Sequence, residues 1–533
     1  MGFLRHIFAF DSHSPLLFTQ LYFWVFLAIV YGGFALIMMR QTRRRLHLRN
    51  VYLMLVSWFF YYKTSGIFLF ILATLTLSNW LLAFAVRRAR DRQADMRARM
   101  WMTLSILINL GFLFYYKYAY FGVDVFNSVF GTHYSIVDKI ILPVGISFYV
   151  FQVTSYIVDV YRRTVQPVRN ILDFGFYVSF FPQLVAGPIV RASEFIPQLY
   201  KPFSLSHRMF GLAVFWILNG LTKKVLLSDY LAVNLIDRVF DNPLLFTGFE
   251  NLFALFAYSL QVYADFSGYT DIATGVALLL GFYLPQNFDS PYKSRNPQEF
   301  WRRWHQSLSR WLKSYVYIPL GGNRTLLGRK VNKLWASNVN SFLTMLIGGL
   351  WHGASWNFVI WGGLNGIGMI VAKCWKALKD AVWGAVTRRW TLPSGPRIQA
   401  LKIHLLRVDN LICILLTFTF ITFTRLFFRS GSNLDPATAN RVAWETAVMM
   451  MQQISGAWDS AIIPSFLWQY RSVVLLFIIG MSIHWLPTHF KRWYRLNFAL
   501  LPWWVIMLIV VAVVMIVYQF VTADLQPFIY FQF

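Results

Sequence analysis

The 533-residue sequence is poor in charged side chains and in cysteine. Asp, Glu, Lys and Arg make up 13% of it, against about 25% in soluble domains. Hydrophobic residues make up 57%, and the mean hydropathy is +0.50. These values exclude a string of soluble domains and predict a polytopic, all-α integral membrane protein. The two cysteines, Cys374 and Cys413, provide neither a disulfide scaffold nor a metal-ligand pair.

Acidic residues are much scarcer than basic ones. The chain has 22 Asp and Glu against 49 Lys and Arg, a formal net charge of +27. Such a charge can serve nucleic-acid binding, but here the cations cluster in short loops beside hydrophobic runs, as the positive-inside rule describes. We therefore expect the lipid bilayer, and no nucleic acid, as the partner of this charge.

The hydrophobic runs predict about 11 spans plus re-entrant segments, in a single polytopic domain over residues 1–533. The first run, Leu16–Met39, is long and lacks the basic segment and cleavage site of a signal peptide, so we expect a retained helix. The alternation of basic loops puts both termini on the extracytoplasmic side. Residues 430–464 hold one cation against three acids, which is typical of an external loop.

Several polar or helix-breaking residues lie inside these runs. Pro143 and Gly145 predict a broken helix, which is tolerated at membrane depth only where protein or water covers it. Lys223 and Lys224 are expected to form a basic turn that ends a helix. Two carboxylates, Asp265 and Asp271, must be ion-paired, hydrogen-bonded or in contact with water. A structural role in helix packing and a role in the site are equally consistent with these two carboxylates.

A strongly basic block covers residues 293–333. It contains ten Lys and Arg and one acid, Glu299, and we place it on the cytoplasmic side. Apolar residues recur in it at helical spacing, which predicts an amphipathic helix at the membrane interface or under a bundle. These residues are Phe300, Trp304, Leu308, Trp311 and Leu312. His305 lies in this helix, where it either serves the site or simply lines an interface.

His352 lies between two apolar runs, 342–350 and 358–372. Basic loops that end at Lys333 and begin again at Lys373 place it at the tip of a hairpin, between the bilayer midplane and the outer edge. An ionisable group at such depth is costly and marks function more often than structure. Imidazole suits a general base, and Asn357 can orient the ring or stabilise an oxyanion. Nearby glycines, Gly348, Gly349 and Gly353, leave room for a close backbone or a substrate.

Several ordered blocks lie across the middle of the chain: Leu142–Tyr149, Gln183–Pro188, Asp265–Tyr269, Tyr283–Phe288, Glu299–Ser309, Tyr317–Arg324 and Leu350–Asn357. Together they resemble the membrane-bound O-acyltransferase family, and in particular its bacterial branch of alginate O-acetyltransferase AlgI-like proteins. The resemblance covers residues 140–365, which we define as the catalytic core.

The resemblance implies a ring of tilted helices, in which a cytoplasmic funnel takes an acyl thioester and a tunnel hands the acyl group to the outer face. It implies that His352 is the catalytic histidine and His305 the second characteristic position. Candidates for lining the tunnel are Asp265, Ser267, Tyr269, Trp304, Trp351 and Asn357. Basic candidates on the donor side are Arg302, Arg303 and Arg324.

The implied function is a membrane O-acyltransferase of the bacterial cytoplasmic (inner) membrane, expected to move an acetyl group from a cytoplasmic thioester to an exopolysaccharide or cell-surface glycan. The donor is acetyl-CoA or another acyl thioester, including one on an acyl carrier protein. We expect no bound cofactor and no metal, because no His, Cys or Asp cluster has ligand spacing. An extracytoplasmic SGNH-type acetyltransferase is the expected partner. Two alternatives stay open: a D-alanyl transferase resembling DltB, and a non-enzymatic transporter or flippase.

Overall fold

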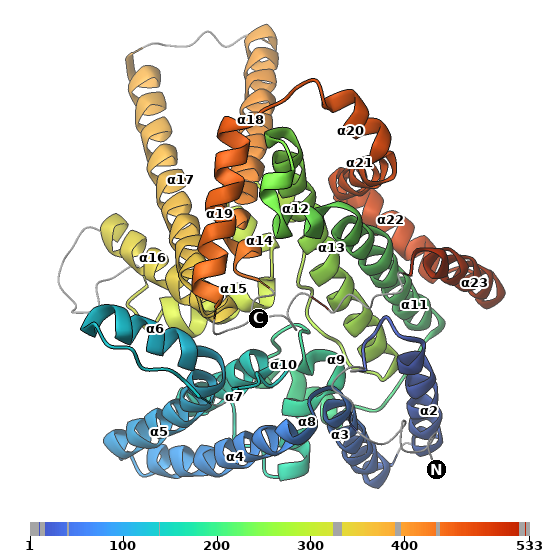
Figure 1. Ribbon diagram of the computed structural model, residues 1–533. Coiled ribbons are helices and arrows are strands. Elements are labelled where there is room, and N and C mark those ends of the chain that lie inside the picture. The colour runs from blue at the N-terminus through green and yellow to red at the C-terminus, as the bar shows by residue number, and fades with distance from the viewer. Residues whose placement is uncertain are drawn as a thin grey trace. The chain divides into compact units, whose positions relative to one another are not determined.

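We analysed a computed structural model of the chain (Figure 1), which describes residues 10, 16–39, 42–137, 139–322, 333–389, 396–432, 438–521 and 528. Within these ranges the chain is built from helices and connecting segments, without a β-strand. The all-α fold class predicted from the sequence is therefore confirmed.

The chain divides into two compact units. Unit 1 consists of residues 1–230, 261–285 and 487–532. Unit 2 consists of residues 231–260, 286–486 and 533. The long helix α13 (Gly248–Leu279) contributes its first part to unit 2 and its second part to unit 1.

Unit 1 contains most of the N-terminal helices and the last two helices of the chain. In chain order these are α2 (Leu21–Met38), α3 (Arg43–Ser65), α4 (Leu69–Asp91), α5 (Asp95–Leu113), α6 (Ala119–Phe130), α7 (Ile146–Tyr161), α8 (Ile171–Ser179), α9 (Phe181–Leu184), α10 (Ala192–Phe195), α11 (His207–Leu221), α22 (Thr488–Ala499) and α23 (Trp503–Phe520). Helix α4 packs against α5, α7 and α8. As a result α7 is buried along nearly its whole length.

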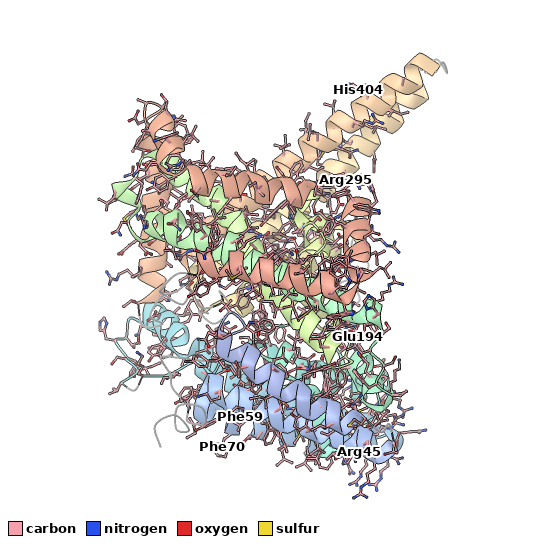
Figure 2. All side chains as sticks on the ribbon, turned by 90° about the vertical axis from the view of Figure 1, so that its right-hand side faces the viewer. Arg45, Phe59, Phe70, Glu194, Arg295 and His404 are labelled. Atoms are coloured by element: carbon pink, nitrogen blue, oxygen red, sulfur yellow. The ribbon has the colours of Figure 1, made fainter. Side chains whose placement is uncertain are left out.

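Unit 2 contains both candidate histidines. Its helices are α12 (Asp237–Asp241), α14 (Pro297–Arg303), α15 (Gln306–Leu312), α16 (Lys333–His352), α17 (Trp356–Arg389), α18 (Pro396–Ser430), α19 (Ala439–Gly456), α20 (Ile463–Gln469) and α21 (Arg471–Trp485). Helix α17 packs against α16, α18 and α19. The helices α17 and α18 form a long hairpin, and His404 lies toward its far end (Figure 2).

Seven helical segments of the described chain are long and apolar enough to cross a membrane, or eight if the pair α20 and α21, bent by 84°, counts as one span. They carry exposed apolar side chains such as Phe70, which is 71% exposed (Figure 2). These features agree with a multi-pass membrane protein. The predicted count of about 11 spans is not confirmed. Residues 430–464, predicted as an external loop, contain α19, and their side of the membrane stays a prediction.

The predicted helix break near Pro143 is present. Gly145 adopts the left-handed conformation (φ +76°) directly before α7. A β-carbon built on it lies 2.8 Å from the carbonyl oxygen of Leu184, so only glycine fits both the conformation and the space.

The prediction that Lys223 and Lys224 end a helix in a basic turn is wrong. Helical structure continues past α11 through a π-helical segment, Thr222–Asp229. Both lysines are satisfied by aspartates of α13, because Lys223 pairs with Asp271 and Lys224 with Asp265. The two carboxylates that the sequence required to be paired are thus the partners that keep these lysines inside a helix.

The amphipathic helix predicted around His305 is also wrong in one respect, since it is interrupted. α14 ends at Arg303 and α15 begins at Gln306. Between them Trp304 is extended and His305 is left-handed, with φ +42°. The apolar periodicity of the two short helices is real, and its members Phe300, Leu308 and Trp311 are buried.

Candidate active site

His352 is the last residue of α16, at the turn into α17. Its position confirms the hairpin tip predicted from the flanking basic loops. The side chain is buried, with 2% of the residue exposed. The turn is tight because Gly353 lies against Phe358, whose ring atoms are 2.0 Å from a β-carbon built on the glycine.

Aromatic rings enclose the His352 imidazole. The centroids of Trp351, Trp361 and Phe428 lie 4.9, 5.0 and 5.2 Å from its own, all in edge-to-face orientation. These rings come from α16, α17 and α18 and keep bulk water away from the imidazole. In such a low-dielectric setting, charge that develops on a reacting group interacts strongly with nearby dipoles and ions.

His305 is fully buried and also lies against Trp351. The ring centroids of His305 and Trp351 are 5.9 Å apart. The indole of Trp351 therefore contacts both imidazoles, and unit 2 brings together three of the residues predicted for the site. A non-glycine residue with positive φ is strained and often functional. The backbone at His305 therefore needs contacts with other residues to hold it in this conformation.

Asn287 holds His305 in place. Its Oδ1 accepts hydrogen bonds from the backbone N–H of Ser307 (3.1 Å) and from the Ser307 hydroxyl (2.9 Å). Nδ1 of His305 lies 3.2 Å from the same oxygen. Because a backbone N–H can only donate, this atom of Asn287 is the oxygen, and Nδ1 of His305 must donate to it. The lone pair of the neutral imidazole is then on Nε2.

The sequence reasoning missed Asn287 as a site residue. The only available signal was its place in the block Tyr283–Phe288, which carries part of the family resemblance. The backbone oxygen of Asn287 also accepts from the N–H of Gln306 at 2.9 Å. One asparagine thus fixes both the start of α15 and the tautomer of the histidine before it.

Burial lowers the pKa of His305 from its usual value near 6.5 to about 3. Its imidazole is therefore neutral over the physiological pH range. A neutral imidazole can accept a hydrogen bond or bind a polar group of a substrate. It does not add positive charge to the site.

Two further residues predicted for the site, Asn357 and Trp304, contact other parts of unit 2. The Asn357 amide donates from Nδ2 to the carbonyl oxygen of Ala443 at 2.9 Å and so ties α17 to α19. Its proposed action on the His352 ring stays a prediction. Trp304 is buried in an aromatic cluster, with Phe288 at 5.0 Å and Phe300 at 5.6 Å between centroids.

The donor-side basic residues differ from one another. Arg302 is exposed. Arg303 is engaged in ion pairs with Glu299 (2.9 Å) and Asp289 (3.5 Å). Arg324 lies outside the described residues. Of the two described arginines, Arg302 is therefore the one whose charge is available to an anionic ligand.

Asp265 belongs to unit 1, where it forms a buried ion pair. Lys224 Nζ lies 2.6 Å from Asp265 Oδ1 and 2.8 Å from Asp229 Oδ1. Lys224 and Asp265 are 4% and 2% exposed. A lysine shared by two carboxylates at this depth stabilises all three charges, because each would be costly alone. This arrangement favours a structural role for Asp265.

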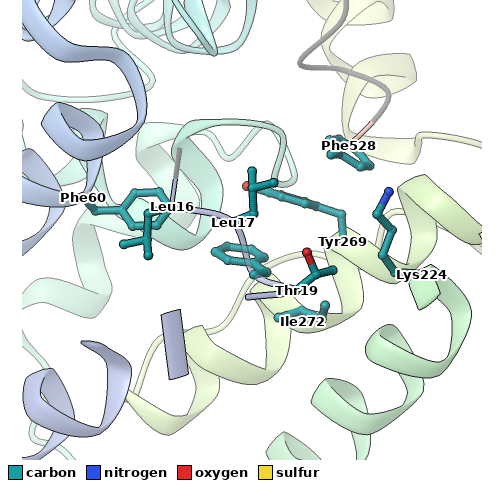
Figure 3. Close-up of a pocket in the computed structure, with 9 residues that line it drawn as sticks. Leu16, Leu17, Thr19, Phe60, Lys224, Tyr269, Ile272 and Phe528 are labelled. Atoms are coloured by element: carbon teal, nitrogen blue, oxygen red, sulfur yellow. The ribbon is translucent and has the colours of Figure 1, made fainter. Parts of the chain in front are cut away.

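Tyr269 and Lys224 line a cavity in unit 1 (Figure 3). Its volume is about 20 Å³, room for about one water-sized group. Tyr269 is stacked between Phe18 and Phe528, with centroids 4.7 and 4.4 Å away. Ser267 is buried, and its hydroxyl has no hydrogen-bond partner within the described part of the chain. A tunnel-lining role for these residues stays a prediction.

Over the described ranges, no group of three or more His, Cys, Asp or Glu is placed to hold a metal ion. What unit 2 does assemble is two buried imidazoles joined by an indole, one of them with a defined tautomer. An imidazole can take, hold and return a proton, which is the part that a histidine plays in acyl transfer, and His352 is the candidate for it.

Comparison with known proteins shows which family and which proteins the chain is similar to. The family model described as "MBOAT, membrane-bound O-acyltransferase family" matches residues 168–416. The chain is 41% identical over 329 residues to a protein of Azotobacter vinelandii named probable alginate O-acetylase AlgI, covering 61% of this chain and 63% of that protein. The match thus spans less than two thirds of that relative's length.

Two relatives with other names also match. A peptidoglycan O-acetyltransferase of Helicobacter pylori is 34% identical over 445 residues, which cover 79% of this chain and 77% of that protein. A teichoic acid D-alanyltransferase of Streptococcus thermophilus is 31% identical over 249 residues, which cover 45% of this chain and 58% of that protein. The match to the Helicobacter protein extends over most of both chains. With the family model, it shows that the chain belongs to the membrane-bound O-acyltransferase family.

Proposed function

We propose that the protein transfers an acetyl group from a cytoplasmic thioester to a hydroxyl on the outer side of the membrane. In this reaction the hydroxyl oxygen attacks the carbonyl carbon of the thioester while the imidazole of His352 takes the hydroxyl proton. The carbon–sulfur bond then breaks, and the thiolate leaves with the bonding electron pair and receives the proton from His352. The products are an ester and a free thiol.

The observation that carries the proposal is the burial of His352 at the turn between α16 and α17, next to a second buried histidine. The imidazole is 2% exposed and is enclosed by three aromatic rings. A base in such a site is shielded from bulk water, which protects a thioester from hydrolysis. The indole of Trp351 packs against both His352 and His305.

The names of the relatives favour acetyl over D-alanyl as the transferred group. The proteins named for O-acetyl transfer match 61% and 79% of the chain at 41% and 34% identity. The match to the D-alanyltransferase is shorter, at 45% of the chain, and 31% identical. D-alanyl transfer from a carrier protein is the second candidate, because it uses the same thioester chemistry.

On the donor side we propose that the basic block 293–333 contacts the phosphates of coenzyme A or an acidic carrier protein. Arg302 is the described arginine best suited to this, since it is exposed and Arg303 is held by Glu299 and Asp289. Phosphates form strong, charge-assisted hydrogen bonds with guanidinium groups.

On the acceptor side we propose an envelope glycan or exopolysaccharide, reached through an extracytoplasmic SGNH-type acetyltransferase. The relatives named for alginate and for peptidoglycan support a polysaccharide acceptor. We place the protein in the bacterial inner membrane with both termini outside. Single cysteines introduced near each terminus, in a background without Cys374 and Cys413, should react with an impermeant maleimide in intact spheroplasts.

The proposal is tested with purified protein in proteoliposomes that contain no partner protein, with and without a soluble saccharide as the hydroxyl acceptor in the lumen. Acetyl-CoA labelled in the acetyl group should be consumed, with one thiol released per acetyl lost, when a hydroxyl acceptor is present in the other compartment. D-alanyl thioester on a carrier protein should be consumed more slowly. Thiol release no faster than in protein-free liposomes, with either donor, would overturn the proposal.

A further inference from the structure

Unit 2 contains a buried arginine, Arg425, that the reaction as described above does not use. It is in α18, within a stretch of apolar residues, and is 4% exposed. Its guanidinium carbon lies 4.4 Å from the ring centroid of Trp304 and 5.1 Å from that of Tyr292. A third ring, that of Phe300, is 5.9 Å away. The cation is therefore held in a cage of aromatic faces.

No acidic residue neutralises Arg425 within the described ranges. One nitrogen, Nη1, donates to the carbonyl oxygen of Ser259 at 3.0 Å and to the hydroxyl of Tyr292. For its Nε–H and both Nη2–H groups the described residues provide no acceptor. An uncompensated buried cation is costly, so a protein keeps one chiefly where an anion will meet it.

A second buried arginine on the same helix, Arg429, has its charge neutralised by an acidic residue. Arg429, one turn further along, is 7% exposed and pairs with Asp237 at 2.8 Å. Its guanidinium also lies over a single ring, that of Phe240, at 5.3 Å. The contrast with Arg425 is one of charge balance, because both are buried and both contact aromatic rings.

The position of Arg425 connects it to both histidines. It lies over Trp304, the residue directly before His305. It is three residues before Phe428, whose ring contacts His352 at 5.2 Å between centroids. Residues three apart on a helix share a face, so Arg425 and Phe428 project from α18 toward the same side. The Cα atoms of Arg425 and Phe428 are thus about one helical turn apart, roughly 5 Å along the axis.

We propose that Arg425 binds the carbonyl oxygen of the acyl thioester and stabilises the oxyanion of the tetrahedral intermediate. This inference rests on the proposed function. When the hydroxyl oxygen attacks, the π-electron pair of the carbonyl moves onto its oxygen, and Arg425 donates hydrogen bonds to the resulting negative charge. When the pair returns, the carbon–sulfur bond breaks and the thiolate leaves. Fixed donors in a water-poor site stabilise such a charge strongly.

The phosphates of coenzyme A or of a carrier arm fit Arg425 less well. In both donors they are at the far end of the pantetheine arm, whereas Arg425 is one turn from the residue that touches His352. When the carbonyl carbon of a thioester lies at His352, its carbonyl oxygen is much nearer to this part of α18 than its phosphates are.

The test compares R425Q and R425K with R429Q as a matched control, using acetyl-CoA and a short acetyl thioester, acetyl-S-N-acetylcysteamine, that carries no phosphate. We expect R425Q to lower kcat roughly 100-fold or more with both thioesters, with KM nearly unchanged and no loss of thermal stability. R425K keeps the charge but loses the planar fork, and its kcat should fall about 10-fold. R429Q should lower the unfolding temperature, since it strands Asp237, and leave kcat unchanged.

Four results would overturn the inference. R425K that folds and turns over at the wild-type rate would do so, as would R425Q with kcat within about threefold of wild type. A raised KM confined to acetyl-CoA would assign Arg425 to the phosphates instead. Wild-type protein that releases no thiol from either thioester would overturn the proposed function and this inference with it, whereas wild-type turnover with unaffected Arg425 variants would overturn the inference alone.

Discussion

The side-chain oxygen of Asn287 lies 3.2 Å from Nδ1 of His305, a residue 18 positions further along the chain. The same oxygen accepts two hydrogen bonds from Ser307. This one contact explains why the apolar periodicity of residues 300–312 does not give a continuous helix. The asparagine offers the backbone after His305 an alternative set of hydrogen bonds, and the chain turns through a left-handed residue to reach them.

We expect Asn287→Ala to destabilise the protein and to reduce turnover. The variant leaves the buried N–H groups of His305 and Ser307 without their acceptor, which costs roughly 1–3 kcal/mol. Gln286→Ala is the control, because Gln286 is the exposed neighbour. Thermal unfolding in detergent and thiol release from acetyl-CoA measure the two effects. Equal behaviour of the two variants would show that Asn287 does not hold the site.

Because of His305, the free energy of unfolding should decrease as the pH is lowered. Burial lowers the pKa of this residue to about 3, while in the unfolded chain it is near 6.5. Below pH 6.5 the unfolded state binds a proton that the folded state does not, so the stabilising contribution is complete above pH 6.5 and is lost as the pH falls toward 3.

The matched variant is His305→Gln, which cannot titrate. Its unfolding temperature should fall less steeply than that of the wild type between pH 7 and pH 5. A titration of the reaction rate near neutrality should have the same midpoint in both proteins, since His305 is already neutral there. A midpoint that moves in His305→Gln would assign the titration to His305 and contradict the account.

Close packing of α16 on α17 should make Gly349 intolerant of substitution. A β-carbon built on Gly349 lies 2.3 Å from the carbonyl oxygen of Phe358 and 3.0 Å from the Cα of Gly362. Gly349→Ala should therefore push the helices apart and cost roughly 1–3 kcal/mol. In Gly363→Ala the nearest atom is 3.5 Å away, and the higher helix propensity of alanine should make this variant neutral or stabilising. Unfolding temperatures in the opposite order would contradict the packing.

The ion pairs around Lys224 predict that removing the lysine lowers stability more than removing one of its two carboxylate partners. Lys224→Met leaves Asp265 and Asp229 buried without their cation, and breaking a buried pair in this way costs roughly 3–5 kcal/mol. Asp265→Asn leaves Lys224 with Asp229, 2.8 Å away. We expect a larger loss of unfolding temperature and of membrane-inserted protein for Lys224→Met. A loss of turnover in Asp265→Asn at normal stability would point instead to a role of Asp265 in the site.

Much of the outline could be predicted from the sequence because it depends on local pattern. The hydrophobic runs gave the all-α membrane class, and the basic loops on either side of residues 342–372 placed His352 at a hairpin tip. Pro143 and Gly145 marked a break that exists. Of the two uses predicted for the glycines around His352, Gly349 shows the first, because it lets the backbone of α17 approach closely.

The features that were missed depend on partners far apart in the sequence. Lys223 and Lys224 look like a basic turn until Asp265 and Asp271, more than forty residues away, are seen beside them. No residue near His305 in the sequence predicts the helix break between α14 and α15, because the break depends on Asn287. Arg425 stands in a span where periodicity cannot say whether its face meets lipid or the interior. The number of spans also depends on how the helices bend, as at the 84° angle between α20 and α21.

The most direct test of the account is glycan acetylation by His352→Ala, with His404→Ala as the control. His404 is an exposed histidine toward the far end of the α17–α18 hairpin (Figure 2). In a strain lacking the gene, each variant is expressed, its membrane level is measured, and alkali-labile acetyl esters on the exopolysaccharide and peptidoglycan are counted. We predict that His352→Ala accumulates normally and restores no acetyl ester, while His404→Ala restores the wild-type amount. Acetylation retained by His352→Ala would contradict the assignment of this histidine as the base.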